Sequence, residues 1–313
     1  MEICKVDKSE YEEQVKECIH AFQSVTFNEL NKDKCDELLY FLFKDTKYRL
    51  GLILGATNKA LQSHFSAPMG GFSPISTSTK IGYFDDALIA LKQWAKENEY
   101  KSIEFYLPPE FYHENLIAKQ VNTLWRHEFI ISNIDLNYAF HLSSFNDEYQ
   151  SQINYNARKN LKISLKANLS FELCTDIDTK QQAYLVIKQK RDNKGFPLRM
   201  TWEQGAETVK IINSDFFLVK NSSGKAIASA IIFHVAPKVV QVVYWGDIFE
   251  YSKLKTMNFL SFKVFEYYKS KNFEVVDLGI STVDSEPNHG LAEFKESIGC
   301  SVSPKFKFKY KIN

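Results

Sequence analysis

The sequence is poor in the residue types that build metal sites and disulfide frameworks. Its five cysteines form no C-x-x-C pair and are odd in number, so we expect reduced thiols rather than disulfides or a zinc cluster. Its seven histidines lack the H-x-x-x-H and H-E-x-x-H spacings that place two ligands on one helix face. We therefore predict no metal site and no tightly bound cofactor.

Long hydrophobic runs are also absent. The longest runs, at 50–56 and 226–235, are far shorter than the roughly 20 apolar residues of a membrane-spanning helix. The amino-terminal sequence MEICKVDKSEYEEQ is acidic where an export signal requires a basic start and an apolar stretch. These absences predict a cytoplasmic protein without a transmembrane segment.

Glycine is scarce, with 12 among 313 residues, and no glycine-rich nucleotide loop is present. Gly51, Gly55, Gly70 and Gly71 match neither a P-loop nor a dinucleotide-binding fingerprint. The pattern excludes the kinase and dehydrogenase classes.

Aromatic residues, in contrast, are abundant. The 25 Phe and 16 Tyr are scattered among β-branched runs, as is typical of buried sheet faces. A chain of 313 residues also exceeds what one hydrophobic core usually serves, so we expect two domains.

Charge is distributed unevenly between the two halves. Residues 1–142 hold 15 Lys and Arg against 20 Asp and Glu, whereas residues 143–313 hold 24 against 18. The basic second half is compatible with a phosphate-bearing substrate or with nucleic acid, and equally with an ordinary solvated surface.

The order of predicted helices and strands repeats along the chain. Each half contains an antiparallel meander, at 38–65 and at 216–245, preceded by helix and followed by helix, strand, helix and strand. A strand at 305–312 closes the second half. The pattern predicts an α/β protein with mixed sheets and two domains, 1–142 and 143–313.

The linker between these predicted domains, near 142–146, is short. We therefore expect the halves to pack closely, with a cleft between them as the default place for a substrate. We also expect a monomer or weak dimer whose second half, expressed as residues 146–313, is not a stable fragment.

Five short motifs carry a family resemblance. They are 66–74 in the first half and, in the second, 155–162, 190–196, 243–247, and 277–279 followed by 291–299. In this order the motifs resemble the Fem family of tandem-GNAT peptidyltransferases and the FemAB-like acyltransferases. The resemblance implies two tandem GNAT domains, with a divergent acceptor-side domain at 1–142 and the transfer site at 143–313.

This resemblance implies transfer of an acyl or aminoacyl group to an amine of a sugar- or peptide-linked cell-envelope precursor. Two alternatives stay open: an aminoacyl-tRNA-dependent peptidoglycan peptidyltransferase, and a catalytically silent binding protein with the same tandem fold. The expected partner is a small-molecule or a lipid- or nucleotide-linked precursor, with tRNA as a further partner and DNA not among them. The motifs do not say whether the acyl donor is aminoacyl-tRNA or acyl-CoA.

Lys295 is the first candidate catalytic residue. Attack of an amine on an ester or thioester develops negative charge on the carbonyl oxygen, and a cation placed there stabilises it. The resemblance implies that role for Lys295 and a packing role for Phe294. In the alternative interpretation, Glu293, Lys295 and Glu296 form the solvated face of a helix.

Four basic residues are candidates for binding a phosphate-bearing substrate. Arg158, Lys159 and Lys162 crowd the first turns of a helix, where positive charge opposes the macrodipole unless an anion compensates it. Arg191, before Gly195, is the fourth. A solvated basic face is the alternative for all of them.

Tyr244 and Asp247 are the remaining candidates. They end a strand at the place where GNAT folds separate two strands to receive the donor, so Tyr244 could donate a proton and Asp247 could orient the amine. Aromatic residues at strand ends are also common in cores, and this alternative stays open.

Two further patterns concern the donor. The glycine-containing pyrophosphate loop of GNAT folds should lie at 249–254, but that segment has no glycine, which disfavours acetyl-CoA. The alternation of lysine and aromatic residues at 305–311 predicts a strand that buries one face while its lysines face solvent or touch a tRNA.

Overall fold

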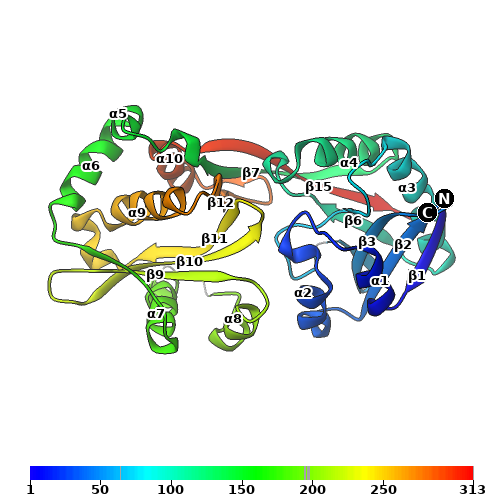
Figure 1. The fold of residues 1–313 in the computed structure, drawn as a ribbon, viewed down its shortest axis with the longest axis horizontal. Helices are drawn as coiled ribbons and strands as arrows, with labels where there is room; N and C mark the ends of the chain where they lie inside the picture. The colour runs from blue at the N-terminus through cyan, green and yellow to red at the C-terminus, as the bar shows by residue number, and fades with distance from the viewer. Residues whose placement is uncertain (64, 194, 196–197, 313) are drawn as a thin grey trace. The chain divides into compact units, whose positions relative to one another are not determined.

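The computed structural model describes residues 1–63, 65–193, 195 and 198–312. The chain forms two compact α/β units (Figure 1). Unit 1 comprises residues 1–136, 284–286 and the carboxyl-terminal segment from Ser303, and unit 2 comprises residues 137–283 and 287–302. Each unit has a mixed sheet with helices, which confirms the predicted fold class.

Unit 1 is built on a sheet of strand order β1-β2-β3-β4-β6-β15-β7, in which β4 and β6 run parallel. Its elements are β1 (Glu2–Val6), α1 (Lys8–Gln14), α2 (Val25–Leu30), β2 (Glu37–Lys44), β3 (Tyr48–Thr57), β4 (Ala60–Gln62), β5 (Ser73–Pro74), α3 (Ile81–Glu97), β6 (Ser102–Tyr106), α4 (Glu114–Arg126), the first part of β7 (Ile130–His141) and most of β15 (Ser301–Lys311).

Phe72 lies at the centre of the unit 1 core. Its ring centre is 5.6 Å from that of Phe43, 5.7 Å from Phe84 and 5.4 Å from Phe105. Gly71 precedes it with φ of 114°, a left-handed conformation that favours glycine. The motif at 66–74 therefore builds the core of unit 1.

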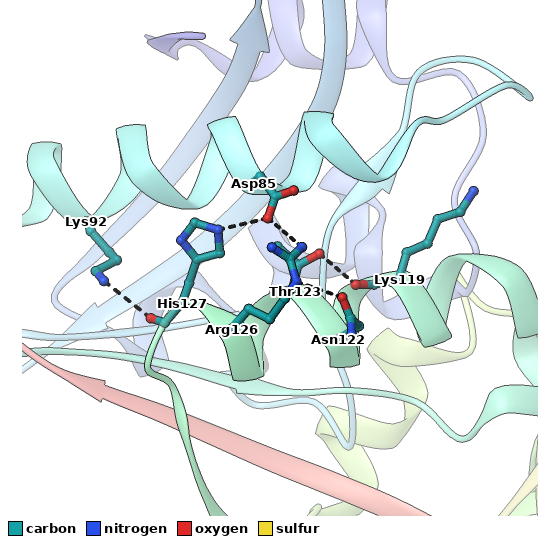
Figure 2. A network of polar contacts seen from close by, with 7 residues as sticks. All are labelled: Asp85, Lys92, Lys119, Asn122, Thr123, Arg126 and His127. Carbon is teal, nitrogen blue, oxygen red and sulfur yellow. Dashed lines mark hydrogen bonds and ion pairs between the residues drawn. The ribbon is translucent and has the colours of Figure 1, made fainter.

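Helices α3 and α4 are joined by a polar network centred on Asp85 (Figure 2). Its carboxylate lies 2.6 Å from an Arg126 guanidinium nitrogen and 2.8 Å from His127 Nε2. Lys92 Nζ donates to the His127 carbonyl at 3.3 Å. Arg126 and His127 lie at the end of α4, whereas Asp85 and Lys92 belong to α3. The network therefore fixes the end of α4 against α3.

Unit 2 has the strand order β7-β12-β11-β10-β9-β8, with β11 and β12 parallel. Its elements are the second part of β7, α5 (Tyr149–Gln152), α6 (Tyr155–Leu165), β8 (Ser170–Leu173), α7 (Ile177–Asn193), α8 (Trp202–Thr208), β9 (Ser214–Lys220), β10 (Ala226–Ala236), β11 (Val239–Asp247), α9 (Thr256–Ser270), β12 (Val275–Ile280) and α10 (His289–Ser297), with a short strand pair at β13 (Thr282–Val283) and β14 (Glu286–Pro287).

Helices α7 and α9 cover opposite faces of the unit 2 sheet (Figure 1). On one face, the Ser229 hydroxyl of β10 donates to the Ala183 carbonyl of α7 at 2.6 Å. On the other, the Tyr268 hydroxyl of α9 donates to the Asp215 carboxylate of β9 at 2.8 Å. These two hydrogen bonds join one helix to each face of the sheet.

Two strands, β7 and β15, belong partly to each unit. The prediction that a strand at 305–312 closes the second half is wrong, because β15 pairs with β6 of unit 1, from Lys307 opposite Tyr106 to Lys311 opposite Ser102. The sequence-based ranges 1–142 and 143–313 thus differ from the structural units at this strand and at β7, where unit 2 begins with Asn137.

Lys311 is exposed as the sequence predicted, but the other three lysines at 305–311 are bonded within unit 1. Lys305 is buried and its ammonium donates to the Pro68 carbonyl at 2.7 Å. Lys307 and Lys309 both pair with the buried carboxylate of Glu104, at 3.2 Å and 2.6 Å. This face of the strand is used inside unit 1.

The described residues contain no cluster of three or more His, Cys, Asp or Glu side chains that could hold a metal ion. Among the helices of the described residues, none combines the length and apolar character that crossing a membrane requires. All five cysteines are free thiols.

The assignment of β15 to unit 1 predicts how fragments behave. Residues 137–302 contain every part of unit 2, whereas residues 146–313 lack β7 and carry β15 without β6. We expect purified 137–302 to melt cooperatively and 146–313 to aggregate or remain unfolded, as circular dichroism melts can show. Equal cooperative melting of both fragments would contradict the assignment.

Candidate functional site

Strands β11 and β12 of unit 2 pair only at their beginnings. The paired residues are Val239 with Val275, Val240 with Val276, and Gln241 with Asp277. Beyond them, β11 continues to Asp247 and β12 to Ile280 without pairing to each other. The facing edges of two sheet strands thus leave backbone groups available to a ligand.

The corresponding strand pair of unit 1, β4 and β6, is arranged differently. There β4 and β6 also run parallel and pair only as far as Gln62 and Glu104. The chain then follows the same edge of β6, because Ser63 N donates to the Glu104 carbonyl at 3.1 Å and Gly70 N donates to the Tyr106 carbonyl at 2.8 Å. The protein's own backbone therefore occupies in unit 1 the edge that unit 2 leaves unpaired.

Asp277 lies at the point where β11 and β12 separate. Its side chain is fully buried and accepts hydrogen bonds from Asn137 Nδ2 at 2.7 Å, Gln241 Nε2 at 2.9 Å and the Gly279 backbone N–H at 2.8 Å. These donors come from β7, β11 and β12. One carboxylate therefore joins three strands and fixes the course of β12 after the last pair.

Lys295 is buried and lies beside the end of β12. Its ammonium donates to the carbonyls of Gly279 at 2.8 Å and Ile280 at 3.1 Å, and it lies 5.4 Å from the centre of the Tyr138 ring. Only 1% of the residue is exposed, so the alternative of a solvated helix face is wrong. Whether Lys295 acts in catalysis stays a prediction.

Burial changes the acidity of the Lys295 ammonium. Loss of hydration lowers the pKa of Lys295 to about 8, while the nearby Asp277 carboxylate opposes the change. The side chain is therefore still mostly protonated at neutral pH, and its charge is only weakly screened by solvent.

Phe294 packs against the unpaired part of β11. Its ring centre is 5.9 Å from that of Trp245, with an edge-to-face geometry that is favourable for aromatic pairs. This contact joins α10 to the strand that carries Tyr244 and Asp247, and the role of Phe294 in the site stays a prediction.

Tyr244 and Arg191 lie together. The Arg191 guanidinium is 5.8 Å from the centre of the Tyr244 ring. Burial raises the pKa of Tyr244, and the positive charge of Arg191 partly opposes this rise. Arg191 thus lies next to a candidate proton donor; of the surrounding 190–196 motif, Lys194 and Phe196 fall outside the described residues.

Asp247 connects β11 to the beginning of α9. Its carboxylate accepts from the Thr256 hydroxyl at 2.6 Å, and Lys190 Nζ lies 3.4 Å away on its other side. Glycine at position 246 leaves room for Lys190 in this position, because a Cβ there would lie 2.3 Å from Lys190 Cδ and the lysine side chain would have to move. Orientation of an amine by Asp247 stays a prediction.

A cavity of about 290 Å³ opens beside Asp247. Its walls come from the end of α7 and the segment after β11, namely Lys190, Asn193, Asp247, Phe249, Glu250 and Ser252. Because it holds carboxylates as well as an ammonium, it suits a ligand that carries both charge signs better than a pyrophosphate.

The other predicted basic residues lie elsewhere in unit 2. Arg158, Lys159 and Lys162 are on α6, and among the described residues no hydrogen bond, ion pair or ring contact joins them to Lys295, Tyr244 or Asp247. The structure therefore brings the predicted residues together in two groups, one around β11 and β12 and one on α6.

Sequence reasoning did not identify Asp277 as a site residue, or the role of Lys190. The signal for Asp277 was present, since a carboxylate inside the apolar strand Val-Val-Asp-Leu-Gly must find donors when it is buried. Nothing in the sequence indicated that Lys190 reaches Asp247, because that contact joins residues 57 positions apart.

Comparison with known proteins shows similarity in structure but not in sequence. The sequence matches no protein family and no curated protein. The fold is similar to that of FemX, with a TM-score of 0.71 and 14% identity over 100% of this chain and 98% of FemX. It is also similar to a tandem GNAT protein from the clavulanic acid biosynthesis pathway, with a TM-score of 0.56 and 9% identity over 100% and 98% of the two chains.

A third similar structure is the C-terminal domain of a protein assigned as a lysylphosphatidylglycerol synthetase from Agrobacterium fabrum. Its TM-score is 0.62, with 12% identity over 98% of this chain and 93% of that domain. The fold is thus that of the tandem GNAT proteins. Within that class the chain shares the architecture of FemX, which confirms the predicted resemblance at the level of the fold.

The Asp277 network predicts a measurable loss of stability. Asp277→Asn places an amide group among three donors, so at least one donor loses its acceptor, and we expect unfolding to become easier by about 2–4 kcal/mol. Asp147→Asn, at an exposed position, is the matched control and should change stability by less than about 0.5 kcal/mol. Urea unfolding of both variants measures the difference, and equal effects would refute the role given to Asp277.

The beginning of α9 predicts poor binding of coenzyme A thioesters. The segment before it lacks glycine, and the Asp247 carboxylate already lies at the helix terminus where a pyrophosphate would bind. Calorimetry with acetyl-CoA should show weak or no binding, and Asp247→Asn should tighten it by about 2- to 5-fold. Micromolar affinity of the wild type would overturn this prediction.

Proposed function

We propose that the protein is an acyl- or aminoacyltransferase that moves an acyl group to an amine of a sugar- or peptide-linked cell-envelope precursor. The observation that carries the proposal is the separation of β11 and β12 in unit 2, with the buried Lys295 ammonium at the end of β12. The tandem GNAT fold, shared with transferases, supports the same reaction class.

In this proposal the donor lies along the unpaired edge of β11. Extended backbone or an extended acyl chain can bond to strand N–H and C=O groups there, as an added strand would. The amine of the acceptor attacks the donor carbonyl, a new C–N bond forms, and the ester or thioester bond breaks. The amine loses a proton, and the leaving oxygen or sulfur takes one up.

Lys295 supplies positive charge where this reaction develops negative charge. Two of the three ammonium protons are donated to the Gly279 and Ile280 carbonyls, which hold the side chain in place before a substrate arrives. An acyl oxygen near the end of β12 would experience a fixed charge in a site of low dielectric. Such preorganised charge stabilises a tetrahedral intermediate without reorganisation.

Tyr244 is the proposed proton donor to the leaving group. Its raised pKa keeps the phenol protonated at neutral pH, and the Arg191 guanidinium beside it would stabilise the phenolate that forms when the proton is transferred. Asp247 would orient the incoming amine, in competition with its contacts to Lys190 and Thr256.

A second candidate is the aminoacyl-tRNA-dependent peptidyltransferase. The similarity to FemX and the poor fit of a pyrophosphate at α9 favour it, since an aminoacyl ester needs no pyrophosphate loop. The cavity beside Asp247 has carboxylates suited to the α-ammonium of an aminoacyl group. Transfer assays with charged tRNA and with acyl-CoA on the same acceptor separate the two candidates.

The role of Lys295 predicts a change in rate that depends on pH. Lys295→Met removes the charge, so kcat/KM should fall on the order of 10²-fold to 10³-fold. In the wild type, kcat/KM should also decline as pH rises through about 8, where the ammonium loses its proton. The variant should lack this decline.

A control variant separates this role from a structural one. Lys269→Met changes an exposed lysine in the last turn of α9, as Lys295 lies in the last turn of α10, and should leave the rate unchanged. Because the folded-state pKa of Lys295 lies below the unfolded value of 10.5, the folded protein binds fewer protons than the unfolded chain between about pH 8 and 10.5. The free energy of unfolding that depends on Lys295 therefore rises with pH in this range.

A Lys295→Met protein that remains folded and keeps more than about a third of wild-type activity would exclude the catalytic role.

A further inference from the structure

Helix α6 has one outward face that carries three lysines. At 100° per residue, Tyr155, Lys159, Lys162 and Lys166 point to the same side, and Lys166 directly follows the last helical residue. The opposite side is buried and consists of Ala157, Leu161 and Ser164. The segment from Tyr155 to Lys166 contains no acidic residue, so no neighbour on the helix neutralises the lysines.

The positive charges on this face are not used within the described part of the protein. Lys159, Lys162 and Lys166 form no ion pair there, and Arg158 donates to the Ser151 carbonyl at 3.3 Å. Their side chains surround a shallow cavity of about 280 Å³, lined by Tyr155, Arg158, Lys159, Lys162, Ile163 and Lys166. Arg158 and Lys159 lie near the start of α6, where positive charge opposes the helix dipole, whereas Lys162 and Lys166 lie at its end. The four cations also repel one another, and an anionic surface would relieve this repulsion.

Apolar side chains accompany these charges at the surface. Tyr155 is 69% exposed, and Ile163 and Leu165, on either side of the lysine row, are 40% and 42% exposed. Such an arrangement is typical of helices that lie in the interface of a lipid bilayer, where basic groups meet lipid phosphates and apolar groups enter the headgroup region.

We infer that α6 docks the protein on an anionic lipid bilayer. Charge complementarity favours a polyanion, and the exposed aliphatic side chains of Ile163 and Leu165 favour a bilayer over RNA, whose phosphates and bases give aliphatic groups little to contact. The docking is independent of the chemistry proposed for β11 and β12.

The first experiment is cosedimentation of the full chain with vesicles. We expect binding to phosphatidylcholine vesicles that contain about 30% phosphatidylglycerol, and little binding to vesicles of pure phosphatidylcholine. A variant with Lys159, Lys162 and Lys166 replaced by Gln should lose on the order of 10²-fold in partition coefficient, since each basic residue near an anionic surface contributes about a factor of five. Equal binding of the two vesicle types by the wild type would overturn the inference.

The matched control removes the same total charge elsewhere. Lys8, Lys16 and Lys47 are exposed in unit 1 and form no ion pair among the described residues, so their replacement by Gln should change the partition coefficient by less than about 3-fold if the location of charge decides binding. An equal loss in both triple variants would show nonspecific attraction and contradict docking by α6.

The second experiment separates a bilayer from a nucleic acid. Replacing Ile163 and Leu165 by Ser keeps every charge but removes the apolar surface that would enter the bilayer interface. This variant should bind vesicles about 10-fold more weakly than the wild type. If this variant binds vesicles as the wild type does, and a single-stranded RNA oligonucleotide displaces both from vesicles, the face is an RNA-binding site and the inference is wrong.

Discussion

The buried carboxylate of Asp277 is the constraint on which the site in unit 2 depends. A charge without access to water must be surrounded by donors, and here they come from three strands at once. Satisfying Asp277 joins β7, β11 and β12 at one level and turns the backbone at Gly279. The carbonyls of Gly279 and Ile280, which follow directly, accept hydrogen bonds from Lys295, so the buried carboxylate and the buried ammonium lie at the same end of β12.

The order of helices and strands could be predicted from the sequence because apolar periodicity and turn residues are local signals. The partner of the terminal strand could not. Alternating lysine and aromatic residues at 305–311 identify a strand with two different faces, but the pattern is equally compatible with either sheet. The buried carboxylate of Glu104 in unit 1 pairs with Lys307 and Lys309. Glu104 is distant from β15 in sequence, so no local pattern indicates this pairing.

For the candidate site, the sequence indicated residues whose roles stay predictions. The motifs indicated Lys295, Phe294, Tyr244 and Arg191, and the structure places these residues along α10, β11 and the end of α7. The burial of Lys295 could not be predicted from the sequence, because the neighbouring glutamates give the helix a polar composition. Only tertiary packing shows that α10 turns Lys295 inward and leaves Glu293 and Glu296 exposed.

The placement of β15 in unit 1 has a consequence for synthesis of the chain. The edge of β6 receives its partner from residues about 200 positions later, as the contact between Glu104 and Lys309 shows with a separation of 205 residues. During translation the amino-terminal half therefore emerges with a sheet that still lacks an inner strand, and the sheet stays incomplete until residues 301–311 leave the ribosome. Until then an unpaired strand edge is exposed, which is the kind of surface that chaperones cover and that promotes misassembly.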